Sequence, residues 1–401
     1  MLQLSIVNFK KDMYIFVEGK RDEGRFFIIR EGHVKITKQS DLIKKDSDLV
    51  LGPGDFVGIV AALAQRSQIE SARALSDVTL LAVNYSQFEE LIQTNTPVAM
   101  KIIQQFSRRI RYLNDALTGI NPNTAADTNA ETLFKTGEYY LNSKMKSAAY
   151  YVFNRYIECY PDGEFARQAE TSVKSLEEYG GQTFKTGNDA FLCTYGKDKI
   201  IFADGEFGNS LYIIQEGTVK ITKILEGNEI ILAILRQGDI FGEMALLENK
   251  PRSASAMAQE DKTILMEVSK RNFELMSRTH PAMIQKLTRL LSERIWFSYK
   301  QLINASLKDP MARIYNYLSI ILEKNKVPRT IKTYIFDFGQ DELMKMAAVP
   351  AERRTVLTGQ LFKDGVIQIN GGKLFTKDVD GIFKLSDYYQ KMCNRDAALR
   401  R

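Results

Sequence analysis

Residues 241 to 254 combine an acidic, a basic and a hydroxyl side chain with several small residues. In this stretch, FGEMALLENKPRSA, Glu243 is followed nine residues later by Arg252 and then by Ser253. An arginine guanidinium is a planar cation suited to phosphate oxygens, and a serine hydroxyl is a further donor. A carboxylate only accepts hydrogen bonds, for example from a sugar hydroxyl. Phosphate at one end and a sugar hydroxyl at the other indicate a nucleotide site.

The backbone of the same stretch also favours an anion. Gly242 allows a sharp turn, and the small residue Ala245 lets the backbone approach a bound group closely. The amides of Met244 and Ala245 then lie at the start of a short helix, where unpaired N–H groups attract negative charge. The chain has only two histidines and three scattered cysteines, which offer no metal-ligand spacing. We therefore expect neither a metal nor catalytic residues at this site.

An earlier stretch repeats this pattern. VGIVAALAQRSQIESARA, residues 57 to 74, matches FGEMALLENKPRSASAMA, residues 241 to 258, and Pro97 matches Pro281. The offset is 184 residues in both cases, since 241−57 and 281−97 are equal. Internal repeats of this length indicate two copies of one domain.

The first copy lacks the charged groups of the second. Ile59 replaces Glu243, and Gln68 replaces Arg252. Loss of the arginine removes the only full positive charge aimed at a phosphate, a contact worth about 1.5 to 3 kcal/mol. We therefore expect the first copy to have kept the fold without the ligand.

Each copy consists of short runs rich in Ile, Val, Phe, Tyr and Thr, broken by turn residues such as Glu31-Gly32. This rhythm is typical of a small antiparallel barrel or jelly roll. Apolar residues at three- and four-residue steps follow Pro97 and Pro281, which predicts a helix after each barrel. The apolar stripe of such a helix either packs on the core or forms a dimer seam.

Two further segments complete the chain. Between the copies, apolar and small residues resemble the spacing of a tetratricopeptide helix pair: Leu133, Gly137, Tyr140, Ala149, Phe153 and Pro161. One such pair cannot bury its own face, so we expect a spacer packed on the barrels, with a peptide-binding surface for a protein partner as the alternative. After residue 308, a helix, two short helices and a hairpin with its tip at Asn370-Gly371-Gly372 are predicted.

The stretch from Phe241 to Ala254 resembles the phosphate-binding cassette of the cyclic-nucleotide-binding domain family, whose pattern is F-G-E-(L/M)-A-L, a loop and P-R-(S/T/A)-A. The preceding strand signature of that family is present around Gly208, Tyr212 and Gly217. The resemblance implies that Glu243 holds the ribose 2′-hydroxyl. It also implies that the cyclic phosphate is held by Arg252, Ser253 and the amides of Met244 and Ala245.

The same family uses the helix after the barrel to contact the base. Alignment of LSERIWFSYKQL with that helix places Ser298 and Tyr299 at the contacting positions. Trp296 either caps the base or only packs in the core. The resemblance favours cyclic AMP as the ligand, although a hydroxyl can serve guanine in cyclic GMP as well.

The last 90 or so residues resemble the winged-helix domain of the catabolite activator and Fnr family of transcription factors. The resemblance makes AERRTVLTGQLFKDG the recognition helix, but Ala351 and Val356 replace two expected base-reading arginines. The target sequence therefore cannot be transferred, and a winged helix kept for protein contact is the alternative. The DNA-binding residues that this resemblance predicts are Glu352, Arg353, Arg354, Thr355, Gln360 and Lys373.

The predicted fold class is a multidomain α+β protein. Its expected segments are a degenerate cyclic-nucleotide-binding-like domain (1–118), a linker (119–129), a tetratricopeptide-like unit (130–182), a cyclic-nucleotide-binding jelly roll with its C-terminal helix (183–307) and a winged helix-turn-helix domain (308–401). A net charge of +6 permits DNA contact. The chain has no apolar run of about eighteen residues and no leader pattern, so we expect a cytoplasmic protein that does not enter membranes.

We expect a cyclic-AMP-responsive transcription regulator, with a sensor that acts on a protein partner, like a kinase regulatory subunit, as the alternative. Dimers through the 281 to 306 helix and an internal pair of the two barrels are both open. No kinase, cyclase or phosphodiesterase signature is present, so an enzyme is not expected.

Overall fold

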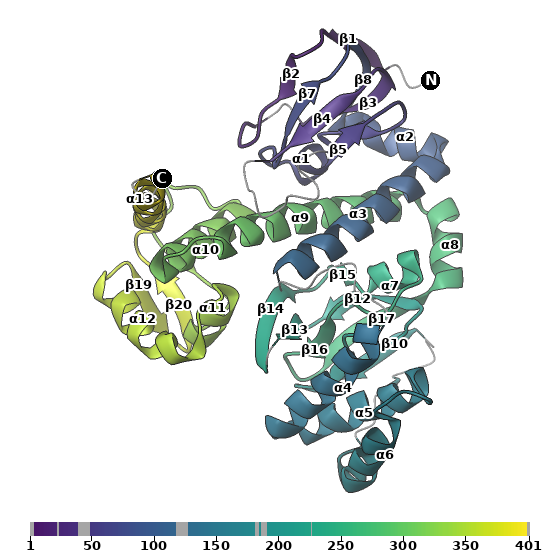
Figure 1. Ribbon diagram of the computed structural model, residues 1–401, viewed down its shortest axis with the longest axis vertical. Helices are drawn as coiled ribbons and strands as arrows, with labels where there is room; N and C mark the ends of the chain where they lie inside the picture. Colours follow the sequence, from purple (N-terminus) through teal and green to yellow (C-terminus); the bar gives the residue numbers. More distant parts are fainter. Residues whose placement is uncertain are drawn as a thin grey trace. The chain divides into compact units, whose positions relative to one another are not determined.

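The computed structural model describes residues 4–21, 24–38, 49–117, 127–180, 184–185, 191–225 and 227–398. The chain forms two compact units (Figure 1). Unit 1 comprises Met1–Ile221 and Ala233–Trp296, and unit 2 comprises Thr222–Leu232 and Phe297–Arg401. Most of the expected linker, residues 118 to 126, lies outside the described residues.

The first copy of the repeat is built from two four-stranded antiparallel sheets. Their orders are β1-β8-β3-β6 and β2-β7-β4-β5. The strands are β1 (Ser5–Phe9), β2 (Tyr14–Phe16), β3 (Arg25–Glu31), β4 (Val34–Thr37), β5 (Leu49–Leu51), β6 (Phe56–Val57), β7 (Ser71–Ala74) and β8 (Val78–Asn84). The helices are α1 (Ile59–Ala64), α2 (Phe88–Thr94) and α3 (Thr96–Leu117).

Alternation along the strands builds the core of this copy. In β4 the side chains of Val34 and Ile36 are buried, while those between and after them are half-buried. Side chains from both sheets, including Phe27, Ile29 and Leu80, meet these residues in one cluster. A period of two therefore places one face of each strand in the space between the sheets.

The second copy repeats this arrangement. Its sheets have the orders β15-β12-β17-β10-β9 and β11-β16-β13-β14. The strands are β9 (Phe184–Lys185), β10 (Leu192–Tyr195), β11 (Ile200–Phe202), β12 (Ser210–Glu216), β13 (Val219–Leu225), β14 (Asn228–Leu235), β15 (Ile240–Phe241), β16 (Ser255–Ala258) and β17 (Thr263–Ser269). The helices are α7 (Glu243–Glu248), α8 (Lys270–Thr279) and α9 (Pro281–Ala305).

Helix α7 begins and ends 184 residues after α1, so the repeat read in the sequence is repeated in the structure. Both helices start at a glycine in the left-handed region, with φ of 76° at Gly58 and 79° at Gly242. The apolar stripes after Pro97 and Pro281 form α3 and α9, and most of their apolar residues are buried.

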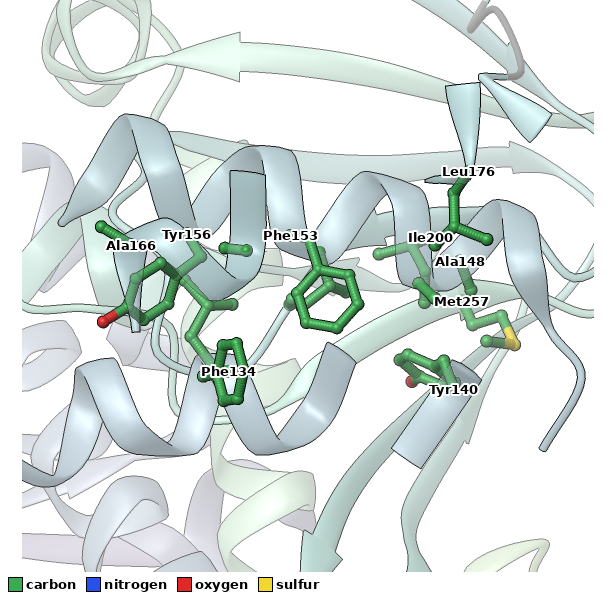
Figure 2. Packing of buried hydrophobic residues seen from close by; sticks show 14 residues of the cluster. Phe134, Tyr140, Ala148, Phe153, Tyr156, Ala166, Leu176, Ile200 and Met257 are labelled. Carbon is green, nitrogen blue, oxygen red and sulfur yellow. The ribbon is translucent and has the colours of Figure 1, made fainter. Parts of the chain in front are cut away.

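A helical unit lies between the two copies. It consists of α4 (Asp127–Asn142), α5 (Lys146–Cys159) and α6 (Ala166–Ser175). Figure 2 shows its core, in which Phe134, Phe153 and Tyr156 pack together and are joined by Ile200 and Met257 of the second copy. The unit thus shares a core with the second copy, as expected of a helix pair that cannot bury its own face. Its assignment as a tetratricopeptide unit stays a prediction.

Unit 2 contains the remaining elements. They are α10 (Pro310–Lys324), β18 (Tyr334–Ile335), α11 (Gln340–Met346), α12 (Ala351–Lys363), β19 (Ile367–Asn370), β20 (Lys373–Thr376) and α13 (Val379–Ala398), together with the end of α9 and residues 222 to 232. Asp309 caps α10 by accepting from the amides of Met311 and Ala312. The strands form a sheet of order β18-β20-β19, and Asn370 pairs with Lys373 across the expected hairpin tip.

Candidate functional site

The stretch singled out in the sequence forms a tight turn into α7. Gly242 has φ of 79°, and a Cβ atom there would lie 2.7 Å from Nη1 of Arg252. Only glycine fits both the left-handed conformation and this close approach. Met244 and Ala245 follow in the first turn of α7, with buried side chains.

The guanidinium of Arg252 is buried and held by backbone carbonyls. Nη1 donates to the carbonyl of Gly242 at 2.6 Å, and Nη2 donates to the carbonyl of Ser210 at 2.9 Å. The group lies over the ring of Phe202, 4.2 Å from its centroid. Among the described residues, the buried Nε has no hydrogen-bond partner. The cation is therefore fixed in position with one donor unmatched.

Glu243 is fully buried and is paired with a residue that the sequence analysis missed. Its Oε1 accepts from Nη1 of Arg294 at 2.9 Å. Its Oε2 is buried and has no hydrogen-bond partner in the described part of the chain. Arg294 lies on α9, four residues before Ser298, so the signal for it was its position on the helix that the family uses for the base.

Both unmatched atoms belong to residues that line one cavity of about 30 Å³. That volume holds about one water molecule rather than a nucleotide. The lining residues are Asn114, Phe202, Ile221, Phe241, Gly242, Glu243, Met244, Ala245, Arg252, Ser253, Ala254 and Arg294. The donor set of one carboxylate, two guanidinium groups, one hydroxyl and one amide suits a phosphate linked to a sugar.

Ser253 lies at the same cavity as expected, but its hydroxyl is turned to sulfur. Its Oγ donates to Sδ of Met244 at 3.6 Å, which is a weak hydrogen bond. A phosphate oxygen is a much stronger acceptor than a thioether, so this hydroxyl is readily exchanged.

The corresponding place in the first copy has no charged groups. Ile59 and Gln68, the counterparts of Glu243 and Arg252, are both buried. The amide Nε2 of Gln68 lies 3.4 Å from the position of a Cβ atom on Gly58, as the guanidinium does at Gly242. The first copy thus keeps the backbone of the turn while an uncharged amide replaces the cation.

Helix α3 of the first copy lies on α7 of the second copy, and Figure 1 shows the two helices side by side. Ser107 Oγ donates to Glu248 at 2.8 Å, and Nε of Arg111 donates to the same carboxylate at 2.9 Å. Nη1 of Arg111 also donates to the carbonyl of Pro251 at 3.2 Å. Residues 107 and 111 of one copy therefore fix both ends of the cassette of the other.

A second contact runs in the opposite direction. The guanidinium of Arg66, just after α1 in the first copy, lies 5.3 Å from the centroid of Trp296 on α9. Each copy thus places its long helix near the short helix of the other, as two subunits do in an isologous dimer. The ring of Trp296 is buried in this contact, which favours the packing interpretation.

Asn114 is the contribution of the first copy to the cavity. It is buried on α3 and stands 184 residues before Ser298, so the two are counterparts in the repeat. The sequence signal was the offset itself, which converts the predicted base contact Ser298 into Asn114. Ser298 and Tyr299 belong to unit 2, and their role in base contact stays a prediction.

The residues predicted to contact DNA lie on α12 and the β19–β20 hairpin. Glu352, Arg353, Thr355 and Gln360 are exposed. Arg354 differs, because its Nε donates to the carbonyl of Val349 at 3.0 Å and helps to fix the turn before α12. Lys373 is 54% exposed and lies 3.8 Å from Asp337. Their role in DNA binding stays a prediction.

In the described part of the chain, no group of three or more His, Cys, Asp or Glu side chains is placed to hold a metal ion. No described helix is long and apolar enough to cross a membrane.

Comparison with known families defines the class of protein. The family described as "Cyclic nucleotide-binding domain" matches residues 6–95 and 192–280. The chain therefore contains two cyclic nucleotide-binding domains, one for each copy of the repeat. It also has homologues in the CRP/FNR family of regulators, as the resemblance implied.

The first such homologue is the cyclic AMP receptor protein of Thermus thermophilus, with 29% identity over 185 residues, 46% of this chain and 82% of that protein. A cAMP-dependent protein kinase regulatory subunit of Mycosarcoma maydis is 36% identical over 74 residues, 18% of this chain and 14% of that protein. A solved structure of a CRP-family transcriptional regulator from Thermus thermophilus has 20% identity and a TM-score of 0.40, and the match covers 48% of this chain and 96% of that chain.

Proposed function

We propose that this chain is a transcription regulator that responds to a cyclic nucleotide bound in its second barrel. One observation carries the proposal: Glu243 and Arg252 are buried at one cavity, each with a polar atom unmatched within the described residues. Such atoms destabilise a protein unless a ligand matches them. A cyclic nucleotide has a phosphate for Arg252 and a ribose hydroxyl for Glu243.

Binding requires a rearrangement, because the cavity is smaller than the ligand. Arg252 has to leave the carbonyls of Gly242 and Ser210, and Arg294 has to release or share Glu243. Arg294 lies on α9, which continues past Trp296 into unit 2. A ligand that prefers the rearranged site would therefore favour one of two pre-existing positions of this helix.

The first barrel takes the place of a second subunit in this proposal. Its helix α3 supplies Asn114 to the cavity and holds the cassette through Arg111. An amide both donates and accepts, so Asn114 suits the edge of adenine or of guanine. We propose cyclic AMP as the ligand, in line with the homologous cyclic AMP receptor protein. Ser298 and Tyr299 remain candidates for further base contacts.

The proposed output is DNA binding through α12 and the hairpin that follows it. Arg353, Thr355 and Gln360 lie exposed on α12, as a helix that enters the major groove requires. An internal pair of barrels leaves one such helix for each chain. The expected target is therefore a single half-site rather than a palindrome.

The second candidate is a sensor that acts on a protein partner, favoured by the similarity to a kinase regulatory subunit. The salt dependence of DNA binding separates the two functions. A regulator loses DNA affinity steeply as salt rises, whereas a sensor of the second kind gives no DNA complex at low salt.

The first test of the ligand is a calorimetric titration of the whole chain with cyclic AMP, with cyclic GMP as competitor. We expect one site per chain, and we expect Arg252→Ala to abolish it. Two sites would contradict the inactive first copy, and no heat with either nucleotide would overturn the proposed function.

A further inference from the structure

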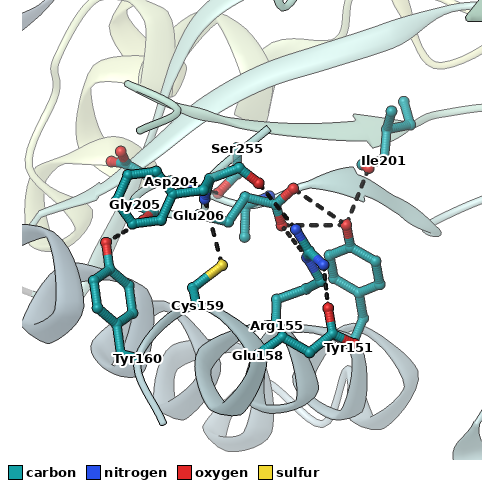
Figure 3. A network of polar contacts seen from close by, with 12 residues as sticks. Tyr151, Arg155, Glu158, Cys159, Tyr160, Ile201, Asp204, Gly205, Glu206 and Ser255 are labelled. Carbon is teal, nitrogen blue, oxygen red and sulfur yellow. Dashed lines mark hydrogen bonds and ion pairs between the residues drawn. The ribbon is translucent and has the colours of Figure 1, made fainter. Parts of the chain in front are cut away.

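One face of helix α5 holds the turn that precedes β12 in the second copy, as Figure 3 shows. Tyr151, Arg155 and Cys159 are four residues apart, so they lie on the same side of the helix. The hydrogen bonds to the turn run from Tyr151 Oη to Glu206 Oε2 (3.2 Å), from Arg155 Nη2 to the Phe207 carbonyl (2.9 Å), from the Phe207 amide to Cys159 Sγ (3.4 Å) and from Tyr160 Oη to the Gly205 carbonyl (2.7 Å).

The same turn holds the backbone of the phosphate-binding arginine. The amide of Gly205 donates to the carbonyl of Arg252 at 2.9 Å, and the amide of Arg252 donates to the carbonyl of Glu206 at 2.8 Å. The amide of Asp204 donates to Oγ of Ser255 at 2.9 Å. Both backbone groups of Arg252 are therefore fixed by residues 205 and 206.

Gly205 lets the helical unit approach this turn. Its φ is +88°, and a Cβ atom there would lie 2.4 Å from the carbonyl oxygen of Asn129 on α4. Any other residue would separate α4 from the turn.

Glu206 carries a charge that the barrel and the helical unit balance together. Its side chain is 5% exposed, and Oε2 accepts from the amide of Ala203 at 3.1 Å and from Nε of Arg155 at 3.4 Å. Burial raises the pKa of Glu206, and the positive charges of Arg155 and Arg252 oppose that rise. Without Arg155, the carboxylate would lose the nearest cation of the helical unit.

We propose that the helical unit is part of the nucleotide site, with Tyr151 and Arg155 as positioning residues that act on Arg252 through Glu206. The inference rests on the proposed function, since it concerns how the same phosphate is held. It assigns the unit a regulatory use: a change in the packing of α5 on the turn changes the affinity for the phosphate. Residues far before Arg252 in the sequence would thus set its affinity.

The test is the dissociation constant of cyclic AMP for the whole chain, measured by calorimetry with Tyr151→Phe. We expect binding about three- to tenfold weaker, because one hydrogen bond to a buried carboxylate is lost. The matched control is Tyr150→Phe, on the same helix, which should bind like the unchanged chain. Equal affinities for Tyr151→Phe and Tyr150→Phe would overturn the inference.

A second readout separates positioning of the phosphate from general damage. Cyclic 2′-deoxy-AMP lacks the hydroxyl assigned to Glu243, so its affinity relative to cyclic AMP reports that contact alone. This ratio should stay unchanged in Tyr151→Phe and collapse in Glu243→Gln. A ratio that falls equally in both variants would show loss of the whole site and would overturn the positioning role.

Charge balance gives the third readout. Arg155→Met leaves Glu206 without its cation on α5 and should weaken binding by more than tenfold, about 1.4 kcal/mol. Adding Glu206→Gln removes the uncompensated charge and should restore part of the affinity. No recovery in the double variant would contradict an action through Glu206.

The outcomes distinguish the inference from the proposed function. If the unchanged chain binds cyclic AMP and Arg252→Ala does not, while Tyr151→Phe and Arg155→Met bind normally, then the proposed function stands and the inference is wrong. If the unchanged chain binds no cyclic nucleotide, both are wrong.

Discussion

Arg294 and Glu243 form an ion pair of 2.9 Å in which the carboxylate is fully buried. The pair joins α9 to the cassette, and it occupies one of the two oxygens that a ribose hydroxyl would use. The other oxygen is unmatched in the described part of the chain. A bound sugar therefore acts on the same carboxylate that holds α9, which makes this pair the simplest link between ligand and helix.

We predict that Arg294→Met lowers the thermal stability of the ligand-free chain and increases the stabilisation given by cyclic AMP. Removing one partner of a buried pair costs about 3 to 5 kcal/mol, since the other charge stays buried. The ribose hydroxyl would restore one partner to Glu243. The measurement is the melting temperature with and without a saturating amount of nucleotide.

Arg289→Met is the control for this prediction, because Arg289 is exposed on the same helix. It should melt like the unchanged chain and gain the same stabilisation from the nucleotide. A smaller ligand-induced shift in Arg294→Met than in this control would mean that Arg294 binds the ligand rather than competes with it.

The contact between the two copies gives a second prediction. Arg111→Met removes the cation from Glu248, whose side chain is only 4% exposed, and the donor from the carbonyl of Pro251. We expect a loss of about 3 kcal/mol of stability. We also expect weaker nucleotide binding, because Pro251 directly precedes Arg252.

Calorimetry and thermal melting of Arg111→Met against Arg108→Met test this contact, since Arg108 is exposed on the same helix. Normal binding in Arg111→Met would mean that the first copy only packs on the cassette and does not support it. In that case the internal pair of barrels would have no part in ligand binding.

The third prediction concerns pH. Burial raises the pKa of Glu206 above its ordinary value of 4.5, so the folded chain binds this proton more tightly than the unfolded chain. Its stabilising contribution is thus complete below about 4.5 and is lost as the pH rises through the raised pKa. Melting temperatures between pH 4 and 7 should fall more for the unchanged chain than for Glu206→Gln.

Glu158→Gln is the control for the pH series, because its carboxylate is 60% exposed on α5 and also pairs with Arg155. It should keep the pH dependence of the unchanged chain. If Glu206→Gln keeps it too, Glu206 titrates near its ordinary value and the network does not govern the acid limb.

The fourth prediction separates the two adjacent arginines of α12. Arg353→Gln should weaken DNA binding and, if Arg353 contacts a phosphate, reduce the slope of log affinity against log salt by about one. Arg354→Gln should lower stability instead, since Arg354 holds the carbonyl of Val349. Binding to a genomic fragment library over a salt series measures the first effect, and thermal melting measures the second.

Lys384→Gln on α13 is the control, because Lys384 is 74% exposed and pairs with Asp380. Unchanged DNA binding in both Arg353→Gln and Lys384→Gln would exclude α12 as the DNA contact and would favour a protein partner.

Local regularities carried most of the fold into the sequence. The alternation in β4, the apolar stripes of α3 and α9, and the glycine-glycine hairpin tip are properties of short segments, so each could be predicted without knowledge of the rest. The constant offset then fixed the second copy from the first. The third helix of the central unit, α6, was not predicted, because the expected pattern ended at Pro161.

By itself, the sequence determined which residues of the cassette could bind a nucleotide and that the first copy had lost them. Only the tertiary structure decided what surrounds that cassette. Arg294, Asn114 and Glu206 reach the site or its support from 51, 129 and 37 residues away from Glu243, as the numbering shows. Such partners are chosen by how helices and sheets pack, and packing depends on the shapes of whole elements rather than on any local pattern.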